Sequence, residues 1–206
     1  MTLVSFIAFP ALILLLIEVA ARTLKLPKEM TRKGSHIVGG LAAALGPLYL
    51  SPLVIALIAL LFAGGLLVVR RTNLLTSVHG VNRKSLGDVL LPTGIAATAL
   101  LFGHSFIAYE FGILVVTFAD TAAALVGKTV PSVGYRFLGA ERSFAGSAAF
   151  FAAALALGVA VVPIPTAMTA LIALALTFAE AASVRGTDNL VLPVLAAALA
   201  LLALGG

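Results

Sequence analysis

The amino-acid sequence predicts an all-α polytopic membrane protein with about eight transmembrane helices, some of them short, and with both termini outside the cell. The first observation is composition: the 206 residues are 62% hydrophobic and only 10% charged, with a mean hydropathy of +1.18. A soluble domain of this length could not bury so much apolar surface. The other two observations are the regular spacing of apolar runs and the placement of basic residues between them. We expect residues 1–206 to form one integral membrane domain.

Apolar runs separated by short polar segments define the expected helices. The runs cover residues 3–21, 36–50, 52–69, 89–103, 106–127, 147–162, 166–184 and 189–204. Several are shorter than the roughly 20 residues that a spanning helix usually needs. The even-numbered runs are the short ones. Either their ends lie below the membrane surface, or these boundaries are displaced by a few residues.

The 13 Lys and Arg residues lie in alternate connections between the runs. Five follow the first run, four the third, three the fifth and one the seventh. The positive-inside rule places those four connections in the cytoplasm and both termini outside. The first run also has its basic residues after it, which favours a retained helix over a cleaved secretory signal. We therefore expect an integral protein of the plasma membrane whose active site, if it has one, faces the cytoplasm.

One apolar run, residues 115–128, contains an acid within it and ends on a base. Asp120 lies eight helical positions before Lys128, which is about 12 Å along a helix and inside the apolar layer. A carboxylate at that depth costs at least about 2.5 kcal/mol, so it needs a partner or a purpose. One interpretation is a structural ion pair with another helix. The other is a functional site at the cytoplasmic face.

Further oxygen-bearing side chains occur at the expected cytoplasmic ends of the runs. Glu180, Asp188 and Asn189 join Asp120 in a set that offers only hard oxygen ligands, which suits Mg²⁺ better than a transition metal. The absence of cysteine excludes disulfides and thiolate metal sites. Asp88, near the start of the fourth run, is a further candidate acid.

Basic residues surround this set on the same expected face. They are Arg32, Lys33, Arg83, Lys84, Lys128 and Arg142. Such a surround suits phosphate groups, although attraction to lipid headgroups is the alternative. Acids for a metal and bases for phosphate together indicate a nucleotide or a phospholipid headgroup rather than a nucleic acid. His36, which opens the second run, is either a general base or phosphate donor, or simply a helix cap.

Five sequence blocks carry a resemblance to a known family. They are RKGSH at 32–36, RKSLGDVLLPTG at 83–94, ADTAAALVGK at 119–128, RSFAGS at 142–147, and a Glu followed by DNLVLP in 180–193. In order and spacing the chain resembles the phytol kinase and dolichol kinase family. These membrane enzymes phosphorylate isoprenoid alcohols with CTP and are related to the phosphatidate cytidylyltransferases.

The resemblance implies roles for several residues. Asp120 and Asp188 would lie at the metal–nucleotide site, with Asn189 and Glu180 beside them. Lys128 and Arg142, with the adjacent Ser143, would hold phosphates.

The expected activity is therefore that of a CTP-dependent lipid kinase that uses Mg²⁺. Its alcohol substrate would lie in the bilayer with the hydroxyl at the cytoplasmic interface. Asp88, His36 and Asp120 all remain candidates for the base that takes the hydroxyl proton. One alternative is a cytidylyltransferase acting on a lipid phosphate. The other is a small secondary transporter, although the expected outer half is nearly bare of charge. The identity of the alcohol and the oligomeric state stay open.

Overall fold

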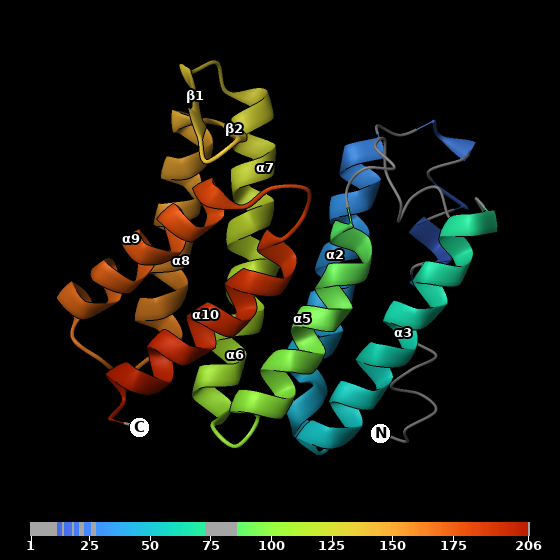
Figure 1. Ribbon diagram of the computed structural model, residues 1–206, viewed down its shortest axis with the longest axis horizontal. Coiled ribbons are helices and arrows are strands. Elements are labelled where there is room, and N and C mark those ends of the chain that lie inside the picture. Colours follow the sequence, from blue (N-terminus) through green and yellow to red (C-terminus); the bar gives the residue numbers. More distant parts are fainter. Residues whose placement is uncertain are drawn as a thin grey trace.

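A computed structural model of the chain describes residues 12–13, 15–17, 19–20, 23–25, 28–72 and 86–205. In this part of the chain, helices joined by short turns make up nearly all of the structure, which confirms the α-helical class (Figure 1). The sequence of elements begins with α2 (Lys28–Leu45), the 3₁₀ turn η1 (Gly46–Leu48), α3 (Pro52–Thr72) and α5 (Gly87–Phe102). It ends with α8 (Phe144–Val161), α9 (Thr166–Ala182) and α10 (Asp188–Ala203).

The middle of the chain forms one long helical rod. It consists of α6 (Phe106–Leu114), a π-helical segment η2 (Val115–Ala119) and α7 (Asp120–Thr129). Together they run without a break for 24 residues, which is about 36 Å at the α-helical rise. In Figure 1 this rod stands between α8 and α9 on one side and α2, α3 and α5 on the other. Asp120 lies on this rod at the start of α7, where Lys33 of α2 contacts it.

Membrane-spanning potential is consistent with the apolar composition. Within the residues that are described, Phe106–Thr129 and Phe144–Val161 are long and apolar enough to cross a membrane. Four shorter apolar helices accompany them, at Pro52–Val68, Gly87–Phe102, Thr166–Ala182 and Asp188–Ala203. The number of spans and the outside location of the termini stay predictions.

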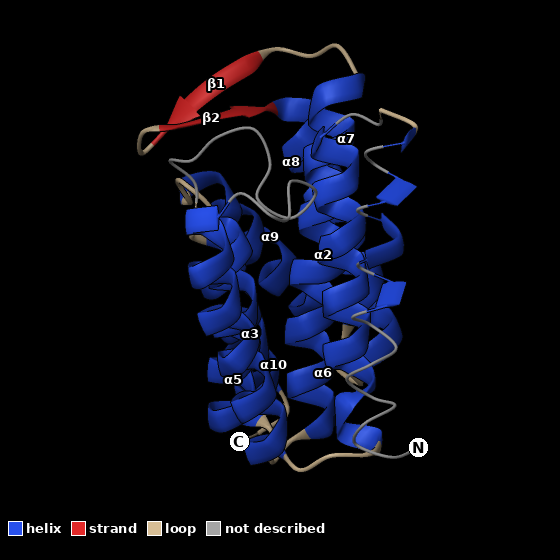
Figure 2. Cartoon of the chain, turned by 90° about the vertical axis from the view of Figure 1, so that its right-hand side faces the viewer, coloured by secondary structure: helices blue, strands red, loops and turns tan. Residues whose placement is uncertain are grey.

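Two local features differ from the sequence-based expectation. The helix expected to begin at His36 begins at Lys28, because the polar segment before His36 continues the same helix and buries Thr31, Lys33 and Ser35. The segment after Lys128 forms an antiparallel hairpin, β1 (Gly134–Phe137) and β2 (Ala140–Ser143). The hairpin lies crosswise over one end of the bundle (Figure 2). Hydropathy reveals neither feature, because both consist of polar or mixed sequence.

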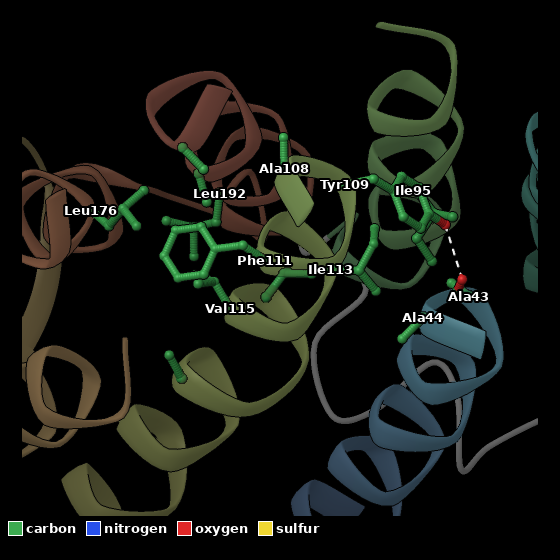
Figure 3. Packing of buried hydrophobic residues seen from close by; sticks show 14 of the residues in the cluster. Ala43, Ala44, Ile95, Ala108, Tyr109, Phe111, Ile113, Val115, Leu176 and Leu192 are labelled. Carbon is green, nitrogen blue, oxygen red and sulfur yellow. Dashed lines mark hydrogen bonds between the residues drawn. The ribbon is translucent and has the colours of Figure 1, made fainter. Parts of the chain in front are cut away.

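The core forms around the α6 end of the rod. Phe111 is fully buried among side chains that include Leu176 of α9 and Leu192 of α10 (Figure 3). Tyr109 is buried on another side of the rod, and its hydroxyl donates to the Ala43 carbonyl at 3.0 Å. That bond satisfies the polar atom of an otherwise apolar side chain. The packing ties α2, α9 and α10 to the rod, and these helices carry the candidate site residues Lys33, Glu180 and Asp188.

Candidate functional site

A buried carboxylate, Asp120, lies at the centre of the candidate site. It begins α7 directly after the π-helical segment and is 6% exposed. Lys33 reaches it from α2: the Nζ donates to Asp120 Oδ2 at 2.5 Å and lies 3.4 Å from the Asp120 carbonyl oxygen. Lys33 is itself only 3% exposed, so the two form a buried ion pair. The structure thus contains the ion pair with another helix that was one of the two interpretations of Asp120. Its partner is Lys33, a residue that the sequence predicted to bind phosphate.

The π-helical turn before Asp120 rearranges the carbonyl groups around it. The Asp120 amide bonds to Val115 O rather than to Val116 O, which would be its partner in an α-helix. The Val116 carbonyl is released from the α-helical pattern, and His36 Nε2 lies 2.7 Å from it. Turns of this kind occur frequently at functional sites. Here the turn provides an acceptor that orients a histidine toward the acid.

His36 lies in the interior of α2 and is 5% exposed, so the expectation that it opens a helix is wrong. A carbonyl oxygen can only accept, and therefore the Nε2 atom that contacts Val116 carries the ring proton. The same Nε2 lies 3.8 Å from Asp120 Oδ2. With Nε2 protonated, Nδ1 is the ring atom able to accept a proton. His36 thus stays a candidate base.

Arg142 contacts two further acids of the site, Glu180 and Asp188. Its Nη2 donates to the carbonyl oxygens of Glu180 at 2.7 Å and Ser183 at 2.8 Å. Its Nε lies 3.1 Å from Glu180 Oε1, and its Nη2 lies 3.7 Å from Asp188 Oδ2. One guanidinium therefore connects the hairpin to the end of α9 and the start of α10. Ser143, the next residue, caps α8 by accepting from the Gly146 amide at 3.1 Å.

The starts of α5 and α10 are joined beside this cluster. Asn189 Nδ2 donates to Gly87 O at 2.6 Å, and the Asn189 amide donates to Asp188 Oδ1 at 2.9 Å. The helices approach so closely that a Cβ added to Gly94 would lie 2.2 Å from Asn189 O. Asp88, in the first turn of α5, is therefore brought to the same end of the bundle as Asp188.

The two groups of charges form one electrostatic cluster. The charges of Asp120, Lys33 and Arg142 all act on the Asp188 carboxyl, and those of Asp120 and Asp188 act on Glu180. The charge of Arg32 also acts on Asp120, so three carboxyl groups face three cations in this cluster and their formal charges balance.

The donor atoms fit the magnesium ion expected from the sequence in type, because they are oxygens. Glu180 Oε2 and Asn189 Oδ1 are buried oxygens that have no hydrogen-bond partner among the described residues. Mg²⁺ in nucleotide enzymes is usually held by one or two carboxylates, with waters and phosphates completing its octahedron. Among the side chains that the structure describes, no three His, Asp or Glu residues are arranged to hold a metal ion. The magnesium site stays a prediction, and in it the nucleotide would supply ligands.

The remaining predicted residues lie further from the buried pairs or outside the description. Lys128 is exposed at the end of α7, and Arg32 is partly buried next to Lys33. Arg83 and Lys84 lie outside the described residues.

Sequence reasoning missed the contact that holds α2 against the π-helical segment. A Cβ on Gly40 would lie 2.0 Å from Thr117 Oγ1, so the contact needs glycine. The sequence signal for this contact is the glycine pair at 39–40, because small residues allow two helices to approach closely.

The sequence of the chain is similar to that of a known protein. The chain is 30% identical over 180 residues to a phytol kinase from Synechocystis sp., and the alignment covers 81% of this chain and 76% of that protein. No protein-family model matches the chain, and no solved structure does. The alignment is long enough to include most of the elements described above. The chain therefore belongs to the phytol kinase family.

Proposed function

We propose that this protein is a CTP-dependent kinase that transfers the γ-phosphoryl group to the hydroxyl of a lipid alcohol of the phytol, polyprenol or dolichol type. Similarity to a phytol kinase supports the reaction class and a lipid-alcohol substrate. The structural observation that carries the proposal is the cluster of buried carboxylates and cations within an apolar helical bundle. The nucleotide donor CTP comes from the family resemblance of the sequence blocks.

The geometry suits a reaction between a soluble nucleotide and a substrate dissolved in the bilayer. Charged groups buried among apolar helices are costly, so they are retained where they serve a partner or a reaction. A lipid alcohol needs no aqueous cavity for its chain, because the bilayer solvates it. Only the hydroxyl must reach the charged cluster. In this proposal that cluster lies at the cytoplasmic face of the plasma membrane, where CTP is available.

Each charged residue has a task in this proposal. Asp120 and Asp188, with Glu180 beside them, would hold Mg²⁺, which would supply positive charge to the phosphates of the nucleotide. Lys33 holds the Asp120 carboxylate in place through its short hydrogen bond. Arg142 holds Glu180 and Asp188 together and presents positive charge to phosphate.

The other predicted residues act at the edge of the cluster. Lys128, with Arg32, Arg83 and Lys84, would contribute charge toward the nucleotide, and Ser143 and Asn189 would add hydrogen bonds to it. Proton removal from the lipid hydroxyl falls to His36, Asp88 or Asp120. Of these, His36 has its proton-accepting atom defined by the bond that Nε2 makes to the Val116 carbonyl.

An isotope-labelling experiment tests the proposal. Purified protein is supplied with Mg²⁺ and with CTP labelled at either the α or the γ phosphorus. The lipid is drawn from a panel of alcohols, including phytol and geranylgeraniol, or from the panel of the corresponding lipid monophosphates. We expect γ label in a lipid monophosphate, with CDP as the second product. A lipid product that carries the α label, formed from a lipid phosphate with release of pyrophosphate, would instead identify a cytidylyltransferase.

A further inference from the structure

The tip of the β1–β2 hairpin is apolar and exposed. Leu138 is 75% exposed, and Phe137 beside it is 37% exposed. Hairpin turns in water usually carry glycine, asparagine or aspartate, so a leucine at the tip exposes apolar surface that water disfavours.

The backbone of this turn adds a second unfavourable feature. Leu138 has φ of 44° and Gly139 has φ of 87°, the two positive values typical of a type I′ turn. Glycine adopts this conformation readily, but leucine does so at a cost because its Cβ approaches the following carbonyl. Leucine also lacks the polar side chain with which asparagine stabilises such a turn. An exposed, strained leucine is therefore an outlier that a purely structural turn does not explain.

The rest of the hairpin is amphipathic. Arg136 and Glu141 pair across the strands at 2.5 Å and are 72% and 77% exposed, so this face is turned away from the protein. Tyr135 and Arg142 lie on the opposite face, where they contact Ser147 and Glu180 of the helices. The hairpin thus has a charged outer face, an inner face that packs on the bundle, and an apolar tip.

The apolar tip is continuous with the apolar outer face of α9. Phe137 packs against Phe178 with 6.5 Å between ring centroids. Phe178 is the last member of a row of exposed apolar side chains on α9 at helical spacing, which are Met168, Leu171, Leu174 and Phe178. On a membrane-embedded bundle such a row contacts lipid. The hairpin crosses the bundle at the end where this row finishes (Figure 2). In a membrane-spanning bundle, the end of such a lipid-facing row lies near the membrane interface.

We propose that the β1–β2 hairpin is a membrane-interface anchor whose partner is the phospholipid bilayer. Leu138 and Phe137 enter the boundary between headgroups and acyl chains, and the Arg136–Glu141 pair stays in water. Because Arg142 belongs to the same hairpin, the anchor holds that guanidinium at a constant depth beside Glu180. This proposal depends on placement in a membrane and not on the nucleotide chemistry, so either can fail without the other.

Single-tryptophan fluorescence tests the anchor cleanly, because the chain contains no tryptophan and no cysteine. Leu138→Trp and the matched control Glu141→Trp are reconstituted in vesicles of phosphatidylcholine brominated near the carboxyl end of its acyl chains. We expect bromine to quench position 138 severalfold more strongly than position 141, and aqueous acrylamide to quench them in the reverse order. Equal acrylamide quenching at both positions, without bromine quenching at 138, would overturn the proposal.

Because tryptophan itself favours interfaces, a second pair of variants removes that bias. Leu138→Cys and Glu141→Cys are labelled with bimane, and aqueous iodide is the quencher. We expect the label at 138 to be severalfold less accessible than the label at 141. Equal accessibility of the two labels would also count against insertion of the tip.

Discussion

The contact between α2 and the π-helical segment allows one substitution to be worked through in detail. In Gly40→Ala, the new Cβ would lie 2.0 Å from Thr117 Oγ1 and 2.7 Å from its Cγ2, whereas ordinary contact begins at 3.4 Å. Thr117 is fully buried and its hydroxyl donates to Ile113 O at 2.6 Å, so the side chain has little room to move. The two segments must therefore separate by roughly the difference between 2.0 Å and 3.4 Å.

This displacement acts on the site because α2 also carries Lys33 and His36. The Lys33–Asp120 bond of 2.5 Å and the His36–Val116 contact of 2.7 Å both bridge the same two segments. Overpacking of this kind costs about 1–3 kcal/mol of stability. We expect Gly40→Ala to lower the unfolding temperature in detergent and to reduce kinase turnover further than the lost stability explains, since Lys33 no longer reaches Asp120.

The control is Gly64→Ala in α3, where an added Cβ meets nothing within 4 Å. Alanine is the better helix former by about 1 kcal/mol, so this variant should be at least as stable as the original protein. The double variant Gly40→Ala with Thr117→Ala removes the two shortest contacts and should recover part of the loss. Thermal unfolding and turnover are measured for all three. Wild-type behaviour of Gly40→Ala in both assays would refute the reasoning.

Three further predictions use the same protein preparation. Asp120→Asn and Asp188→Asn should each remove Mg²⁺-dependent turnover and weaken Mn²⁺ binding measured by electron paramagnetic resonance, with the fold retained; near wild-type turnover at saturating Mg²⁺ would exclude that residue as a ligand. Arg142→Lys keeps the charge but loses the guanidinium fork, so denaturation should show a loss of about 1–3 kcal/mol; unchanged stability would contradict this. Single cysteines at Ser77 and Ser105 should react with an impermeant thiol reagent on intact cells only at 105, and labelling of 77 alone would reverse the topology.

Several properties of this protein follow from local sequence. Hydropathy is a sum over neighbouring residues, so the helical class and the approximate position of most helices could be read directly from the apolar runs. The family could also be read, because its blocks keep order and spacing along the chain, and the similarity to a phytol kinase confirms it. Prediction from local hydropathy failed where polar and apolar residues are mixed. The helix containing His36 starts at Lys28, and the hairpin beyond Lys128 was not expected.

Only the tertiary structure decided which charges meet. Lys33 and Asp120 are separated by 87 residues, and Arg142 reaches Glu180 across 38. Composition predicts that buried charges need partners, but the choice of partner depends on helix packing, and packing depends on a close approach such as that of Gly40 to Thr117. The π-helical turn has the same origin: an unusual hydrogen bond at Asp120 is tolerated because His36, from another helix, uses the carbonyl it releases. Pairings of this kind are global, since each requires several helices to be in place at once.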